Sequence, residues 1–127
     1  MVDRRHTGAL DGERGLGQSV TRAAMLQGIA KTKAHGVAVL SIRNSGHMGR
    51  IGTYGEMAAR AGLVAILVVN VVGHRGLVAP HGGAFGRLGT NPICIAVPDR
   101  DPETPFVLDM ATSKVAVGKL RVAAAKG

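Results

Sequence analysis

His47 is the side chain of this sequence best suited to chemistry on a small molecule. It lies in the segment Asn44-Ser45-Gly46-His47-Met48-Gly49, between glycines that leave open space for a ligand. An imidazole titrates near neutral pH, so it can exchange a proton with a hydroxyl or carbonyl oxygen. The alternative is a surface histidine that only hydrogen-bonds to the backbone, and the local sequence leaves both open.

Two further segments offer groups that could hold a ligand. Gly86-Arg87-Leu88-Gly89-Thr90-Asn91-Pro92 precedes an expected strand, and Asp109-Met110-Ala111-Thr112 follows another. Backbone N–H groups and short polar side chains at such junctions bind a phosphate, a ribose or an amide. Each segment alone is typical of a turn, but together they are the most specific feature of the chain.

The glycines around His47 do not match a Rossmann dinucleotide fingerprint. Gly46, Gly49 and Gly52 are spaced G-x-x-G-x-x-G rather than G-x-G-x-x-G. The next expected strand ends in Asn70, where an acidic ribose ligand would stand in a Rossmann site. We therefore do not expect a Rossmann site.

Metal and thiol chemistry are also disfavoured. His47, His74 and His81 could form a three-histidine site, but few carboxylates lie nearby and no short ligand spacing is present, so we expect no metal. The single cysteine, Cys94, excludes an internal disulfide and fits a reducing cytoplasm. Its place between two isoleucines indicates a small buried apolar residue, with a reactive thiol as the alternative.

Composition limits the class of protein. The 127 residues are 46% hydrophobic, enough for one domain or a piece of one. The net charge is +8, but no basic run exceeds two residues and only three residues are aromatic, so a solvated basic surface is favoured over nucleic-acid binding. No apolar run approaches the roughly 18 residues of a membrane span, and we expect a cytoplasmic protein.

The hydrophobic pattern predicts an α/β fold in which helices and strands alternate. Residues 1–18 are expected to be a loop or ragged end, and residues 73–89 a shaped, glycine-rich loop. The expected helices are 19–35, 53–62 and 114–125. The expected strands are 37–42, 63–70, 93–97 and 106–108; 37–42 is expected to be buried and 63–70 to be central in its sheet.

Particular residues are expected to shape these helices. Thr53 and Glu56 have the spacing of a capping box, and Thr112 or Ser113 is the expected N-cap of the last helix. Gly36 is the expected C-terminal stop of the first helix. The apolar face of that first helix is expected to consist of Val20, Ala23, Leu26, Ala30 and Ala34.

Several segments resemble, in order and spacing, the malate/L-lactate dehydrogenase family of nicotinamide-dependent oxidoreductases. The resemblance runs from about Leu10 to the end of the chain. It is carried by Asn44-Ser45-Gly46-His47-Met48-Gly49, 54–59, 77–80 with Gly82-Gly83, Leu88-Gly89-Thr90-Asn91-Pro92 and 105–112.

The resemblance implies an α/β fold whose cofactor domain is unlike the Rossmann fold, and a homodimer. It implies hydride transfer between NAD or NADP and a small 2-oxo or 2-hydroxy acid. By position, His47 resembles the family's histidine that exchanges a proton with the substrate oxygen. Asp109, Met110 and Ala111 resemble part of the cofactor-binding stretch, and Thr90 and Asn91 are further candidates near the same site.

Family members carry an earlier helical segment with an arginine and a Ser-His-Gly motif, which helps to bind the substrate carboxylate. That segment is missing here, and the chain stops soon after the cofactor motif. We therefore expect residues 1–127 to be a single partial domain, an internal fragment that is inactive alone. The alternatives are a basic module that binds anions or nucleic acid without catalysis, and a non-functional remnant of a dehydrogenase.

Overall fold

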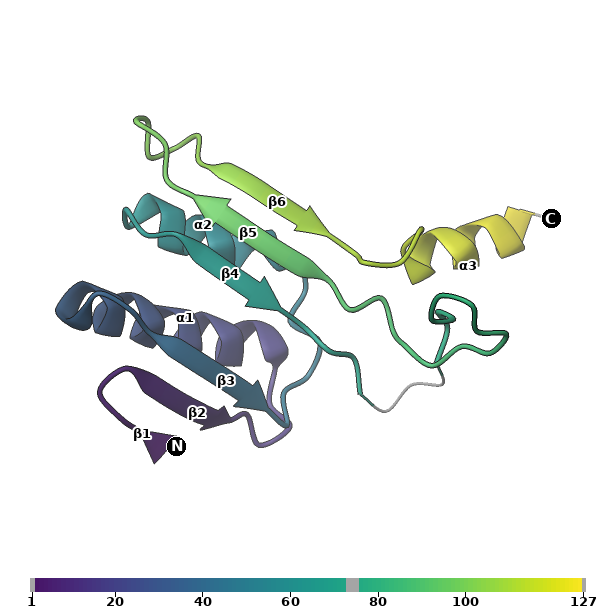
Figure 1. Ribbon diagram of the computed structural model, residues 1–127, viewed down its shortest axis with the longest axis horizontal. Coiled ribbons are helices and arrows are strands. Elements are labelled where there is room, and N and C mark those ends of the chain that lie inside the picture. Colours follow the sequence, from purple (N-terminus) through teal and green to yellow (C-terminus); the bar gives the residue numbers. More distant parts are fainter. Residues whose placement is uncertain (1, 73–75, 127) are drawn as a thin grey trace.

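The computed structural model describes residues 2–72 and 76–126 (Figure 1). Helices and strands alternate in the first half of the chain, which confirms the α/β class. The predicted strand over 93–97 is confirmed at both ends. In chain order the elements are β1 (Val2–Asp3), β2 (Thr7–Asp11), α1 (Gly17–His35), β3 (Val39–Arg43), α2 (Gly52–Arg60), β4 (Ala65–Val68), β5 (Ile93–Val97), β6 (Phe106–Met110) and α3 (Val117–Lys126).

The described strands form two three-stranded sheets. In the order β1-β2-β3, β1 pairs antiparallel with β2, and β2 pairs parallel with β3 in the register Thr7↔Val39 to Asp11↔Arg43. The order β4-β5-β6 is antiparallel throughout, and Cys94 of β5 lies opposite both Leu67 and Asp109. Figure 1 shows α1 and α2 on the same side of the strands.

The prediction of a loop or ragged end over residues 1–18 is wrong. Strands β1 and β2 lie in this segment, and α1 already begins at Gly17. Because β2 pairs parallel with β3, α1 is the crossover helix of a β-α-β unit, which needs a first strand before the helix. The short pattern Thr7–Asp11 contains a glycine and two polar ends, so its strand character comes from pairing rather than from hydrophobicity.

The predicted helix over 19–35 is confirmed, and Gly36 ends it in the left-handed conformation at φ 84°. Its predicted apolar face is wrong, because Leu26 is 46% exposed and the buried residues are Gly17, Thr21 and Ala24. The helix packs through small residues that allow a close approach, and the Thr21 hydroxyl is satisfied by the Gly17 carbonyl oxygen at 2.7 Å.

The core lies where α2 packs on β5. Cys94 and Ala96 of β5 are fully buried, and they face Tyr54, Ala58 and other buried residues at the start and end of α2. Gly55 makes this close approach possible, since a methyl group there would lie 2.8 Å from Cys94 Sγ. The prediction that Cys94 is a small buried residue is confirmed.

Strand β4 is not central, contrary to prediction. Among the described residues it pairs with β5 alone, and Ile66 and Val68 are 70% and 74% exposed. Leu67 alternates with them and packs toward the core on the helix side. Strand β3 alternates in the same way, with Val39 exposed, so the prediction of a buried strand is also wrong there. The apolar pattern of both strands reflects a sheet face that no described element covers.

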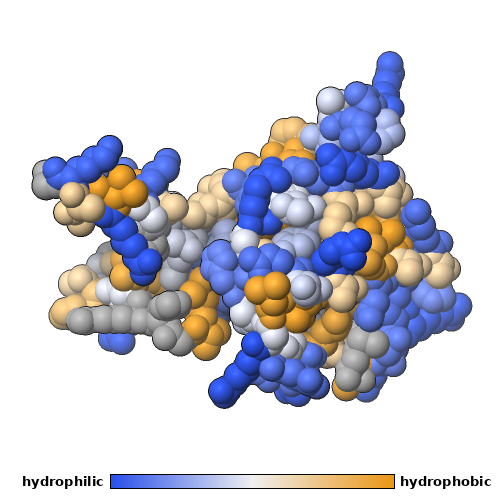
Figure 2. Space-filling model, turned by 180° about the vertical axis from the view of Figure 1, so that it is seen from behind, coloured by the Kyte–Doolittle hydropathy of each residue, from blue (hydrophilic) through white to orange (hydrophobic). Residues whose placement is uncertain are grey.

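The described part of the glycine-rich segment after β4, residues 76–89, is a loop, as predicted. An isolated antiparallel bridge joins Val78 to Leu88 and closes its described part. His74 and Arg75 lie outside the described residues. The loop and α3 extend away from the two sheets (Figure 1). Figure 2 shows the helix side of the molecule, where hydrophilic side chains are interspersed with smaller hydrophobic patches.

A first prediction concerns the packing of α2 on β5. Gly55→Ala should lower the free energy of unfolding by about 1–3 kcal/mol, because the new methyl group meets the short side chains of Cys94 and Ala96. Gly28→Ala is the matched control, since its methyl group would meet only the flexible end of Leu40 at 3.2 Å. Thermal unfolding measures the stability of both variants. A Gly55→Ala chain at least as stable as the Gly28→Ala chain would contradict the packing of α2 on β5.

A second prediction concerns the buried thiol. Burial raises the pKa of Cys94, with a smaller contribution from the Asp109 carboxylate. The thiol should therefore react with a disulfide reagent at least on the order of a hundredfold more slowly in the native chain than in denaturant. Equal rates in the two conditions would show that β5 is not covered as described.

Candidate active site

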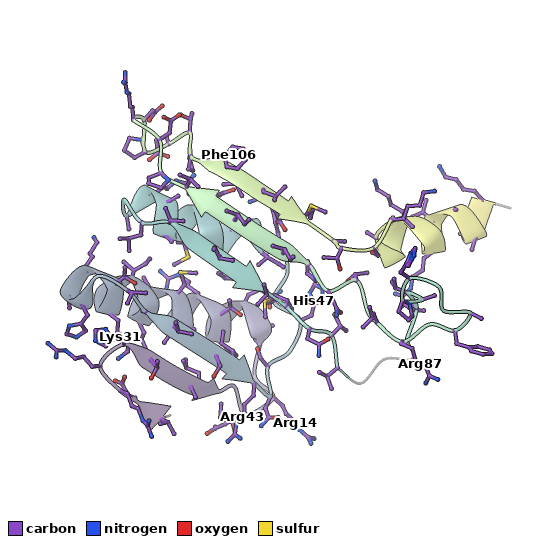
Figure 3. All side chains as sticks on the ribbon, in the orientation of Figure 1. Arg14, Lys31, Arg43, His47, Arg87 and Phe106 are labelled. Atoms are coloured by element: carbon purple, nitrogen blue, oxygen red, sulfur yellow. The ribbon has the colours of Figure 1, made fainter. Side chains whose placement is uncertain are left out.

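The candidate residues gather at one end of the sheets. Figure 1 shows the carboxyl ends of β2, β3, β4 and β6 at this end, together with the start of β5. The loop with His47 follows β3, residues 90–92 precede β5, and Ala111 follows β6. Figure 3 shows that His47, Arg14 and Arg43 also lie at this end. The topology thus brings together the segments that the sequence predicted as ligand-binding.

His47 itself lies exposed in the loop between β3 and α2. Its Nδ1 accepts a hydrogen bond from the Gly49 N–H at 3.0 Å. A neutral ring that accepts at Nδ1 carries its proton on Nε2, so the ring presents Nε2–H to a ligand. Gly49 has φ 75°, which favours glycine and lets its N–H turn back to the ring.

One side of the His47 loop is fixed by the segment between β2 and α1. The Asn44 side chain donates to both carboxylate oxygens of Asp11 at 3.1 Å. Backbone N–H groups of Arg14 and Gly46 donate to the carbonyl oxygens of Asn44 and Gly15, at 2.7 and 3.1 Å. Residues 11–15 therefore shape the start of the loop.

Charge and close packing reinforce this side. The backbone N–H of Glu13, and then the Asn44 amide, lower the pKa of Asp11, so its carboxylate stays ionised as an acceptor. Gly17 lies directly against the backbone of Gly46 and His47, and any side chain there would overlap it. Sequence reasoning missed these residues, although glycines at 12, 15 and 17 were a signal of close backbone approach.

Tyr54 fixes the other side of the loop. Its hydroxyl donates to the Met48 carbonyl oxygen at 2.6 Å, and the side chain is only 4% exposed. Burial raises the pKa of Tyr54, so the hydroxyl remains a proton donor. The residues on either side of the imidazole are thus held by different elements.

Asp109 caps α2, a role that the sequence did not indicate. Its Oδ2 accepts from the Gly52 N–H at 2.8 Å and lies 3.9 Å from Arg50 Nε. The predicted capping box of Thr53 and Glu56 is wrong, because the N-cap is Ile51, without a side-chain cap. Glu56 instead accepts from Arg50 at 2.6 Å.

The other candidate cofactor residues lie where β5 begins and β6 ends. The Thr112 N–H donates to the Thr90 carbonyl oxygen, and its hydroxyl to that of Asn91, both at 2.9 Å. Ala111 is therefore held beside these residues, while Met110 lies half-exposed on the sheet face without helices. Asn91 Oδ1 is buried and has no hydrogen-bond partner among the residues described.

The start of the last helix differs from prediction. Asp109 and Met110 end strand β6 rather than forming a strand-to-helix junction, and α3 begins only at Val117. Neither predicted N-cap serves the helix, because the Thr112 hydroxyl bonds to the segment before β5 and the Ser113 hydroxyl donates to the Val115 carbonyl oxygen.

A cavity of about 250 Å³ adjoins the His47 loop. Met48 and Gly49 of the loop line it, together with Arg50, and Arg22 of α1 brings positive charge. Across residues 2–72 and 76–126 no group of three His, Cys, Asp or Glu side chains could hold a metal ion. Over the same residues, no helix combines the length and apolar character needed to cross a bilayer.

The chain matches known proteins over its whole length. The sequence model of malate/L-lactate dehydrogenase matches residues 2–127. The chain is 42% identical over 127 residues to an L-lactate dehydrogenase of Cupriavidus necator, covering 100% of this chain and 36% of that protein. It is 48% identical over 118 residues to hydroxycarboxylate dehydrogenase B of Escherichia coli O157:H7, covering 93% of this chain and 32% of that protein.

Solved structures agree with the sequence matches. Malate dehydrogenase from Pyrococcus horikoshii superposes with a TM-score of 0.86 at 44% identity, covering 95% of this chain and 33% of that one. Malate dehydrogenase from Entamoeba histolytica gives 0.91 at 32% identity, covering 100% and 34%. The chain spans about a third of the length of the curated relatives it matches. Because the family model matches residues 2–127 of this chain and solved relatives share its fold, this chain belongs to the malate/L-lactate dehydrogenase family.

Proposed function

We propose that the protein to which this chain belongs transfers a hydride reversibly between NAD(P)H and a small 2-oxo or 2-hydroxy acid. The observation that carries the proposal is the position of His47 (Figure 3), on a loop fixed from two sides, at the end of the sheets where β5 begins and β6 ends. Relatives named for lactate, malate and sulfolactate support the same substrate class, a carboxylate beside the reacting carbon.

The residues around Asn91 fit a nicotinamide cofactor. A buried amide oxygen without a partner suits a ligand N–H, such as that of the nicotinamide carboxamide. Thr90 and Ala111 would border the same ligand, since Thr112 ties their segments together. When bound, the nicotinamide supplies or takes up the hydride. These contacts do not distinguish NAD from NADP.

The role of His47 is to exchange a proton with the substrate oxygen through Nε2. For a proton to pass fully through Nε2, the other ring nitrogen must itself be protonated, and it then cannot accept from Gly49. The hydrogen bond seen between Gly49 and Nδ1 therefore belongs to the resting ring, which offers a donor to a carbonyl oxygen. Proton transfer opens that bond.

Positive charge near the loop favours anionic ligands. Arg22 lines the cavity beside it, and the chain as a whole has a net charge of +8. Both the substrate carboxylate and the cofactor phosphates are anions, so this potential raises their local concentration.

We also propose that the whole protein is a cytoplasmic homodimer in which this chain is part of a domain.

A third prediction tests the proposed catalytic residue in a full-length chimera. This chain replaces the matching part of hydroxycarboxylate dehydrogenase B, and turnover of 2-oxo acids is followed by nicotinamide absorbance. His47→Ala should lower kcat by about a hundredfold or more, the usual effect of losing a general acid. His81→Ala, in an exposed loop, is the control. A chimera that folds but is inactive, or one indifferent to His47→Ala, would contradict the proposed function.

A fourth prediction uses the isolated chain. In the His47→Ala chain the Gly49 amide proton should lose its acceptor, and its NMR shift should move upfield. His81→Ala, in an exposed loop, is the control and should leave the Gly49 shift unchanged. A Gly49 shift that is the same with and without the imidazole of His47 would show that the hydrogen bond does not form.

A further inference from the structure

We propose that Asp109 is a positioning residue, whose carboxylate anchors the start of α2, and with it the His47 loop, to strand β6. The inference rests on the proposed function only for its effect on catalysis. The contact itself is a property of this chain. It assigns Asp109 a role different from holding the cofactor with its side chain.

The contact joins segments far apart in sequence. Asp109 Oδ2 accepts from the Gly52 N–H at 2.8 Å across 57 positions of the chain. The first N–H groups of a helix lack partners within it, and Ile51 offers no side-chain cap. A carboxylate from the sheet therefore satisfies the helix and also meets the positive end of its dipole.

Gly52 is built into this contact. A methyl group there would lie 2.9 Å from Asp109 Oδ2 and 2.9 Å from the Arg50 guanidinium. Alanine at this position would have to push aside the ends of both side chains, so it would disturb the carboxylate that accepts from the Gly52 N–H.

Arg50 connects the Asp109 carboxylate to the loop that carries His47. Its guanidinium binds Glu56 at 2.6 Å and lies 3.9 Å from Asp109, so it sits between two carboxylates. Arg50 is three residues from His47 in sequence. The path from the sheet to the imidazole thus runs through Asp109, Gly52 and Arg50.

Strand β6 holds the Asp109 side chain in position. Asp109 pairs in register with the fully buried Cys94 of β5, and its side chain points to the helix side while Met110 lies on the other face. The Asp109 side chain is only 21% exposed. Since the carboxylate is engaged within the protein, a cofactor at this end of the sheet would meet the neighbouring backbone and Thr90, Asn91 and Ala111.

The test compares Asp109→Ala with Asp109→Asn, which keeps an acceptor of the same shape. In the isolated chain, Asp109→Ala should speed hydrogen exchange of the Gly52 amide roughly tenfold to a hundredfold, and Asp109→Asn should restore much of the protection. Asp99→Ala is the control, because among the described residues its carboxylate accepts only from the adjacent Arg100 N–H. Unchanged Gly52 exchange in Asp109→Ala would overturn the proposal.

Kinetics of the full-length chimera separate positioning from cofactor binding. Asp109→Ala should lower kcat about tenfold or more while leaving KM for the cofactor nearly unchanged, with partial rescue by Asp109→Asn. A raised cofactor KM with unchanged kcat would assign Asp109 to cofactor binding instead. If the chimera is inactive, hydrogen exchange of the Gly52 amide still shows whether the Asp109 carboxylate holds the start of α2. Failure of the proposed function is therefore distinguished from failure of this inference.

Gly52→Ala provides a second route if Asp109→Ala does not fold. It breaks the same contact from the helix side, so it should speed exchange across the first turn of α2 and lower kcat to a similar extent. The double variant should be no more affected than either single one, because both remove one interaction. Fully additive effects would show that the two residues act separately.

Discussion

A loop without regular secondary structure keeps a side chain in one place only when groups outside it satisfy its backbone. In this chain the hydrogen bonds that reach the loop between β3 and α2 come from three directions. Asp11 and its neighbours bind its first residues, Tyr54 binds its middle, and the Asp109 carboxylate binds the helix that follows it. The imidazole of His47 depends on these contacts more than on any secondary structure of its own.

Close approach of small residues makes these contacts possible. Gly17 lies against the loop backbone, and Gly55 allows α2 to rest directly on Cys94. With only three aromatic residues in the chain, packing depends on short distances between small side chains rather than on large rings. The high glycine content is therefore a structural requirement at particular positions.

Local sequence patterns were enough to predict the α/β class, the helix ending at Gly36 and strand β5, because these features depend on the spacing of nearby apolar residues and on a single glycine. They failed for Thr7–Asp11, whose strand forms by pairing with β3, and for the buried face of α1, which is made of Thr21 and Ala24 rather than larger apolar residues. The cap of α2 by Asp109 could not be predicted, since its partners are 57 positions apart. Exposed apolar residues such as Ile66 misled the prediction of a central strand because local sequence does not reveal what covers a sheet face.

The proposed function requires His47 to meet the reacting oxygen at the end of the sheets where Asn91 and Ala111 lie. A crystal structure of the full-length protein with nicotinamide cofactor and a 2-oxo acid analogue would locate both ligands. We expect a hydrogen bond of about 3 Å between His47 Nε2 and the analogue's oxygen, with the nicotinamide beside Asn91. An imidazole turned away from the analogue, with the nicotinamide bound on another part of the molecule, would contradict it.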